Sequence, residues 1–116
     1  MGAQATYHLP TELAQRVCDG FHTTLGVGMI VAVSHGEIVA ASAKERIGQK
    51  HAGAARIMAG EVAEIAVNRE EAEASKGAMR EGYNLGINFD GHRLCSIGFA
   101  VPPEDVAPLS LLSQLW

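Results

Sequence analysis

The chain has 116 residues, of which 47% are hydrophobic and 19% are charged, so we expect one globular domain over residues 1–116. A net charge of −4 with no basic stripe argues against a nucleic-acid surface. No apolar run is long enough to span a membrane and the first ten residues lack the features of a signal peptide, so we expect a cytoplasmic protein.

The first predicted element is an amphipathic helix over residues 11–25. Its apolar side chains recur at four-residue spacing, at Leu13, Val17, Phe21 and Leu25, with Ala14 and Cys18 widening the stripe. Thr11 is predicted to cap the helix, and Gly26 to end it in the left-handed conformation.

A β-hairpin and a short helix are predicted next. Residues 28–34 form an almost continuous apolar strand, His35-Gly36 a tight turn, and residues 37–42 the returning strand. A loop follows over residues 43–50. Residues 51–60 are rich in Ala and are predicted to form a short helix close to its neighbour.

The second half repeats the alternation of helices and strands. Residues 64–67 predict a brief strand, and residues 68–76 a helix capped by Asn68 with Glu71 three positions on, closed by Gly77. Two further strands, residues 83–89 and 92–101, are joined by Asp90-Gly91, a strong hairpin signal. A terminal helix is predicted to begin near Pro103 or Pro108 and to run to Trp116. The order favours an α+β domain, with one central antiparallel sheet and flanking helices.

The loop between the second strand and the short helix is the strongest candidate site. A guanidinium at Arg46 can hold a carboxylate with two parallel hydrogen bonds, and Gly48 would let the backbone approach a ligand. The alternative is a surface arginine paired with Glu45 or Asp90.

His51 stands at the predicted first turn of the short helix, where it can donate a hydrogen bond to the same carboxylate. The helix N-terminus disfavours a protonated His and an anion favours it, so binding would take up protons if the ligand has the larger effect. The alternative is a capping histidine with no ligand.

A second candidate patch begins at Arg80-Glu81-Gly82. Gly82 permits an unusual backbone angle before a strand, and Asn84 offers donors and acceptors to the hydroxyls of a ligand. The alternative is a turn that begins a strand.

Signals for catalysis and for metal or cofactor binding are absent from the sequence. There is no Gly-rich phosphate loop, C-x-x-C, H-E-x-x-H or G-x-S-x-G motif, and Ser42 has no evident base partner, so we predict no catalytic residue, no metal and no cofactor. Cys18 and Cys95 lie in apolar patterns and are predicted to be buried thiols, although a disulfide is possible on sequence grounds.

Several of these segments, taken in order, resemble the sugar diacid recognition family. The matching segments are Ile38-Val39-Ala40-Ala41-Ser42, Arg46-Ile47-Gly48, His51-Ala52-Gly53-Ala54, Gly82-Tyr83-Asn84-Leu85, Ile97-Gly98 and Pro102-Pro103-Glu104-Asp105-Val106. The resemblance implies a PAS-like or profilin-like sensor that binds sugar acids such as glucarate, galactarate or glycerate. It also implies that Arg46 and His51 hold a carboxylate. The candidate ligand-binding residues are Ser42, Arg46, Gly48, His51, Gly82 and Asn84.

The resemblance has three departures and one difference in length. Ser34 and His35 precede the glycine of the first hairpin, where the family usually has Asp, and Gly86 stands where the family usually has Pro. Val101 stands where the family has Gly before the Pro-containing end. Regulators of this family continue into a helix-turn-helix region beyond the sensor. We therefore expect the input domain of such a regulator, or a stand-alone relative, without direct binding of nucleic acid by this chain.

The alternative interpretation is the small haem-degrading-type family, which is related to a corrinoid adenosyltransferase accessory domain. That family also has an opening helix, an apolar hairpin and a profilin-like fold, and its members would bind haem or another cofactor.

The predicted terminal helix carries an apolar stripe formed by Leu109, Leu112 and Trp116. We therefore expect a homodimer that uses this stripe, with the opening helix able to take part.

Overall fold

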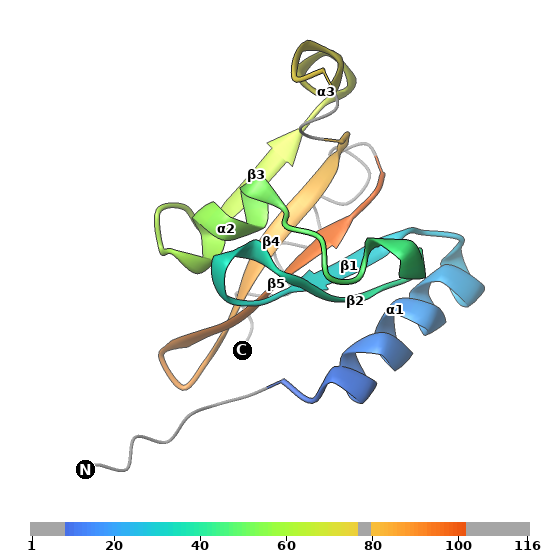
Figure 1. Ribbon diagram of the computed structural model, residues 1–116, viewed down its shortest axis with the longest axis vertical. Helices are drawn as coiled ribbons and strands as arrows, with labels where there is room; N and C mark the ends of the chain where they lie inside the picture. The colour runs from blue at the N-terminus through green and yellow to red at the C-terminus, as the bar shows by residue number, and fades with distance from the viewer. Residues whose placement is uncertain (1–8, 77–79, 102–116) are drawn as a thin grey trace.

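A computed structural model describes residues 9–76 and 80–101. Five strands form one antiparallel sheet in the order β2 (Ile38–Ala41), β1 (Met29–Ala32), β5 (His92–Phe99), β4 (Gly82–Phe89) and β3 (Glu64–Val67). Two helices, α1 (Thr11–Leu25) and α2 (Ala52–Met58), lie against it (Figure 1). The predicted α+β architecture, a central antiparallel sheet with flanking helices, is therefore confirmed. The predicted terminal helix and the closing role of Gly77 lie outside the described residues.

The predicted elements up to the site occur close to their expected bounds. The opening helix is α1 (Thr11–Leu25), the hairpin strands are β1 (Met29–Ala32) and β2 (Ile38–Ala41), and the short helix is α2 (Ala52–Met58). A 3-10 turn, η1 (Ser34–Gly36), joins β1 to β2, and a second, η2 (Lys44–Arg46), lies in the loop before α2.

The elements predicted between residues 64 and 101 are also present. β3 (Glu64–Val67) has the predicted bounds, α3 (Arg69–Ala74) follows it, and β4 (Gly82–Phe89) and β5 (His92–Phe99) form the second hairpin. The predicted capping box is confirmed: Asn68 Oδ1 accepts from the Glu71 N–H at 2.8 Å, and the Glu71 carboxylate accepts from the Asn68 N–H at 3.0 Å.

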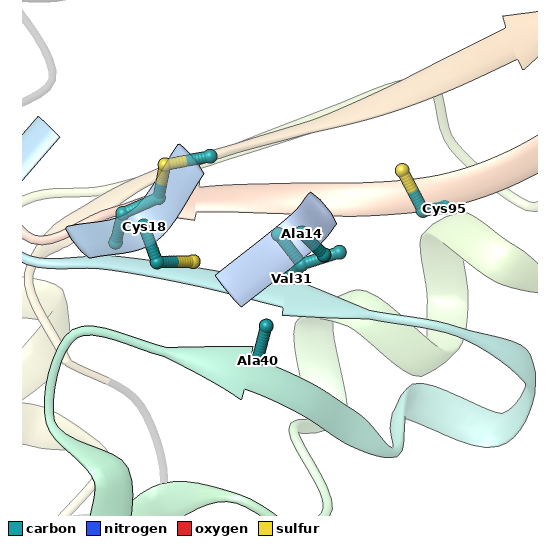
Figure 2. Close-up of a cluster of buried hydrophobic side chains, with 6 residues drawn as sticks. Ala14, Cys18, Val31, Ala40 and Cys95 are labelled. Atoms are coloured by element: carbon teal, nitrogen blue, oxygen red, sulfur yellow. The ribbon is translucent and has the colours of Figure 1, made fainter. Parts of the chain in front are cut away.

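The packing face of α1 differs from the prediction. Ala14 and Cys18 are buried against the sheet, whereas Leu13 is 47% exposed and Val17 is 38% exposed. Figure 2 shows Ala14 and Cys18 beside Val31 of β1. Small side chains let the helix lie close to the strands, so the buried stripe is centred on these residues rather than on the large apolar ones.

The predicted cap of α1 is wrong. Pro10 is the N-cap residue and Thr11 is already helical, and no side chain caps this end. At the other end Gly26 has a φ of 70°, as predicted, and its N–H donates to His22 O. Gln15 ties the middle of the helix to β2, because its amide donates to Ala41 O at 2.7 Å and accepts from Ala41 N–H at 3.1 Å.

The two faces of the sheet carry different side chains. Met29 and Val31 belong to the core cluster with α1, and Cys95 joins them there. Ile30 and Ala32 alternate with them along β1 and form a second cluster with Ile38, Ala41 and Ala54, on the α2 side. Because α1 and α2 cover opposite faces, the loop before α2 is carried over the α2 face of the sheet (Figure 1).

Both cysteines are free and buried, as predicted. Burial raises the pKa of each thiol to about 11. None of the described helices is long and apolar enough to cross a membrane. Among residues 9–76 and 80–101, no three His, Cys, Asp or Glu side chains are grouped so that they could hold a metal ion.

Candidate functional site

The loop from β2 to α2 folds back along β2 and is held there by backbone hydrogen bonds. The Gly48 N–H donates to Ile38 O at 2.8 Å, and the Ile38 N–H donates to Gln49 O at 2.9 Å. Gly48 has a φ of 93°, a left-handed conformation that favours glycine. This turn fixes the backbone position of Arg46, two residues earlier, and so the point from which its side chain extends.

His51 is held by the turn between β1 and β2. Its N–H donates to Gly36 O at 2.9 Å. A Cβ at Gly36 would overlap the His51 carbonyl oxygen and lie 2.9 Å from the Ala55 nitrogen, so only glycine permits this close approach. The predicted His35-Gly36 turn therefore positions the start of α2.

The His51 side chain caps α2, which was one of the two predicted alternatives. Its Nδ1 accepts a hydrogen bond from the Ala54 N–H at 2.9 Å. A ring nitrogen that accepts cannot carry a proton, so the neutral ring has its proton on Nε2, which remains available as a donor. Burial lowers the pKa of His51 below its usual value of 6.5, and the charges of Arg46 and Arg80 lower it further.

Arg46 has a buried polar atom that lacks a partner. Its Nε has no hydrogen-bond partner among the described residues, and neither predicted pairing, with Glu45 or with Asp90, is an ion pair there. Burial lowers the pKa of Arg46, and Arg80 lowers it further against the opposing effect of Glu45. We call the group formed by Arg46, Arg80 and His51 the cation cluster. The two arginines repel each other, and both disfavour a protonated His51.

The cation cluster lines a pocket on the α2 face of the sheet. The pocket has an empty volume of about 290 Å³, part of it open to solvent. Besides the cluster, its walls are formed by residues from β1, β4 and β5 and their ends, namely Gly28, Met29, Ile30, Glu81, Gly82, Asn84, Gly98, Phe99 and Ala100.

The register of the sheet brings the second predicted patch to the first. Asn84 of β4 pairs with Gly98 of β5, and Gly98 pairs with Ile30 of β1, so the three lie in one row across the sheet. Asn84 is only 5% exposed. A Cβ at Gly98 would overlap Asn84 Oδ1, and a Cβ at Gly82 would lie 2.5 Å from Phe99 O. Gly98 therefore leaves the space that the Asn84 amide occupies, and Gly82 lets β4 approach the backbone of Phe99.

Four of the six predicted ligand-binding residues line this one pocket: Arg46, His51, Gly82 and Asn84. Ser42 and Gly48 are not among the lining residues. The Ser42 hydroxyl accepts from the Met29 N–H at 3.0 Å and so holds the end of β2 to β1, while Gly48 makes the turn described above.

Sequence reasoning missed Arg80, Glu81 and the glycines of β1 and β5. Arg80 and Glu81 stand immediately before Gly82 in a segment that the sequence marks out, but no charge was assigned to the site from there. Gly28 and Gly98 could have been found from their positions, because a glycine beside or within a strand often marks a place where another group approaches the backbone closely.

The fold and the pocket define an α+β domain with a small polar site that is open to solvent and lined by Arg46, Arg80 and His51. A family model for sugar diacid recognition matches residues 9–115. The chain belongs to the sugar diacid recognition family, as its motifs predict.

One curated relative is a carbohydrate diacid regulator of Escherichia coli (strain K12). It is 29% identical over 104 residues, which are 88% of this chain and 26% of the relative, so the chain spans about a quarter of that protein's length. No solved structure matches the chain. The PAS-like description of the fold therefore stays a prediction.

Proposed function

We propose that this chain is a non-catalytic sensor domain that binds sugar acids or dicarboxylates of the glucarate, galactarate or glycerate kind. In this proposal it acts in the cytoplasm as the input domain of a carbohydrate diacid transcriptional regulator, or as a stand-alone relative. The family and the regulator to which the chain is similar support that role.

The observation that carries the proposal is the buried Arg46 Nε of the cation cluster, which has no hydrogen-bond partner in residues 9–76 and 80–101. A buried donor that lacks a partner costs free energy, and repulsion among Arg46, Arg80 and a protonated His51 would add to this cost. A bound carboxylate would supply the acceptor for Arg46 and oppose that repulsion. Asn84 and Glu81 would then face the ligand's hydroxyls.

The non-catalytic part of the proposal is supported by the family, whose model describes recognition, and by the regulator to which the chain is similar. The described residues that line the pocket include no Ser, Thr, Cys or Lys. His51 Nδ1 is already occupied by the Ala54 N–H, which leaves only the donor side of the ring for a ligand.

The test is calorimetric titration of glucarate, galactarate and glycerate into the protein and into two Arg→Ala variants. Arg46→Ala should weaken binding roughly 10- to 150-fold, which corresponds to about 1.5–3 kcal/mol for a charge-assisted hydrogen bond. Arg56→Ala is the matched control, because Arg56 pairs with Glu61 at 3.3 Å in a separate groove and should leave the affinity unchanged. Equal binding by Arg46→Ala and the parent protein contradicts the assigned site.

The proposal also includes a homodimer. The apolar stripe predicted for residues 109–116 lies outside the described residues, but the half-exposed Leu13 and Val17 on α1 offer apolar surface to a partner. A two-fold pair is the commonest closed arrangement of identical chains. Light scattering at tens of micromolar should give twice the chain mass of 12.2 kDa. A monomer mass that does not change on deletion of residues 109–116 would refute the dimer.

A further inference from the structure

The two arginines that line the pocket are carried by different parts of the sheet. Arg46 belongs to η2, which lies against β2. Arg80 stands two residues before Gly82, the first residue of β4. The strands β1 and β5 lie between β2 and β4 (Figure 1). Because neighbouring strands are about 4.8 Å apart, β2 and β4 are separated by about 14 Å, so the backbones of Arg46 and Arg80 lie on opposite sides of the pocket.

Small residues lie between these two sides. At this end of the sheet the Ser42 N–H donates to Met29 O at 2.9 Å, and the Ala100 N–H donates to Gly28 O at 2.8 Å. A Cβ at Gly82 would lie 2.5 Å from a carbonyl oxygen of β5, so β4 follows directly. Gly28, Ala100 and Gly82 all line the pocket and carry at most a methyl group. These three positions therefore leave room for an elongated ligand that lies across the strand ends from one arginine to the other.

The described part of the protein neutralises neither arginine. Arg46 Nε is buried without a hydrogen-bond partner there, and Arg80 makes no ion pair with a described residue. The charge of Arg80 lies near enough to lower the pKa of Arg46. Glu81 is the sole acidic residue among the described residues that line the pocket, so two permanent cations and one carboxylate are present. A ligand with two anionic groups can supply one to each arginine.

A linear six-carbon sugar diacid has its carboxylates at opposite ends and its hydroxyl groups between them. When one carboxylate is held by Arg46 and His51, a carbon chain that lies across β1 and β5 brings the other carboxylate to the side that carries Arg80. The buried Asn84 amide lines the same pocket, and it can both donate to and accept from the hydroxyl groups.

We propose that Arg80 is a second anion-binding residue of this pocket, which binds the far carboxylate of a dicarboxylate while Arg46 binds the near one. The inference rests on the proposed function, since it concerns the same pocket. It adds a residue to the site and a reason for preference, because a sugar acid with a single carboxylate leaves Arg80 without its partner.

The test compares glucarate with gluconate, in which a hydroxymethyl group replaces the second carboxylate. Calorimetry on the full chain at pH 7.5 should show glucarate bound roughly fivefold more tightly than gluconate, as expected for one partly exposed ion pair. Arg80→Ala should abolish this preference by weakening glucarate alone, with the affinity for gluconate unchanged. Arg80→Lys keeps a positive charge and should retain part of the preference. Arg69→Ala is the matched control, because Arg69 is an exposed arginine of α3 outside the pocket lining.

The possible outcomes separate this inference from the proposed function. Equal losses of affinity for glucarate and gluconate in Arg80→Ala would mean that Arg80 shares the carboxylate held by Arg46, and would overturn the inference. Equal binding of the two acids by the parent protein would also overturn it, and would leave the carboxylate sensor standing. Failure of both acids to bind the parent protein would refute the proposed function and the inference together.

Discussion

His51 has two separable tasks under the proposed function, because Nδ1 caps α2 and Nε2 is the ring nitrogen left to donate to the ligand. We predict that His51→Ala loses both, and that His51→Asp loses only the second. Loss of an N-cap costs about 1 kcal/mol, and the Ala54 N–H is the donor that would be left without its partner. Asp is among the preferred N-cap residues, so the free energy of unfolding of His51→Asp should lie within about 0.5 kcal/mol of the parent value.

The two variants should rank in the opposite order for ligand affinity, with His51→Ala binding more tightly than His51→Asp. Ala removes one donor, which costs about 0.5–1.5 kcal/mol of binding, or roughly 2- to 13-fold in affinity. Asp removes the donor and adds a negative charge next to the carboxylate, so its affinity should fall further than that of Ala. The assays are urea unfolding for stability and calorimetry for binding. If His51→Asp is as unstable as His51→Ala, or binds as well as the parent, the two roles assigned to the ring are wrong.

The hydrogen bond from the Ala54 N–H to His51 Nδ1 also makes the free energy of unfolding depend on pH, because it requires a neutral ring. The pKa of His51 is lowered by burial and by the two arginines, so the unfolded chain takes up a proton at a higher pH than the folded chain does. The contribution of neutral His51 to stability is complete above its ordinary pKa of 6.5 and is lost as the pH falls toward the lower folded value. The free energy of unfolding should decline below about pH 6.5. His51→Asn, which can cap without titrating there, should flatten that decline, and a parallel decline in both proteins would refute the assignment.

Three predictions concern the sheet and the core. Gly82→Ala should lower stability by about 1–3 kcal/mol in urea unfolding, since a Cβ would lie 2.5 Å from Phe99 O, and an unchanged midpoint would contradict this packing. Ser96→Ala should be neutral or stabilising by the same assay, because the buried Ser96 hydroxyl has no partner among the described residues, and a large loss would reveal a missed one. Cys18 and Cys95, with pKa values of about 11, should react with a thiol reagent at pH 7.5 only after unfolding, and rapid labelling of the folded protein would refute their burial.

Local patterns in the sequence were enough to predict most of the sheet. Asp90-Gly91 requires a tight turn, and β4 and β5 pair on either side of it. The capping box at Asn68 and Glu71 set the start of α3 because both of its hydrogen bonds are local. The packing face of α1 could not be predicted in the same way. Which side of an apolar helix is buried depends on how near the strands lie, and this is a property of the whole core.

The site was predicted in two pieces that the sequence could not join. Arg46 and His51 belong to one loop, and their chemistry is evident from residue type. Asn84 reaches them only through the register of β4, β5 and β1, which is a long-range property. Arg80 is exposed, and nothing in the sequence around it indicates that it lies near Arg46. It was missed because the fold, and not its own segment, brings it to the pocket.

Arg46 links the stability of this domain to the presence of its ligand under the proposed function. A buried guanidinium nitrogen with no acceptor destabilises the folded chain, and Arg46 Nε has no hydrogen-bond partner among the described residues. A carboxylate that binds only the folded state removes this cost, and at 100 times its dissociation constant it would stabilise the fold by about 2.7 kcal/mol. Replacing Arg46 with an apolar residue of similar length, as in Arg46→Met, should therefore leave the ligand-free protein as stable as the parent or more so, while abolishing the ligand-dependent gain in melting temperature. A structural arginine would behave in the opposite way, with a loss of stability in the absence of any ligand, and thermal melts of the two proteins with and without glucarate or gluconate distinguish these cases.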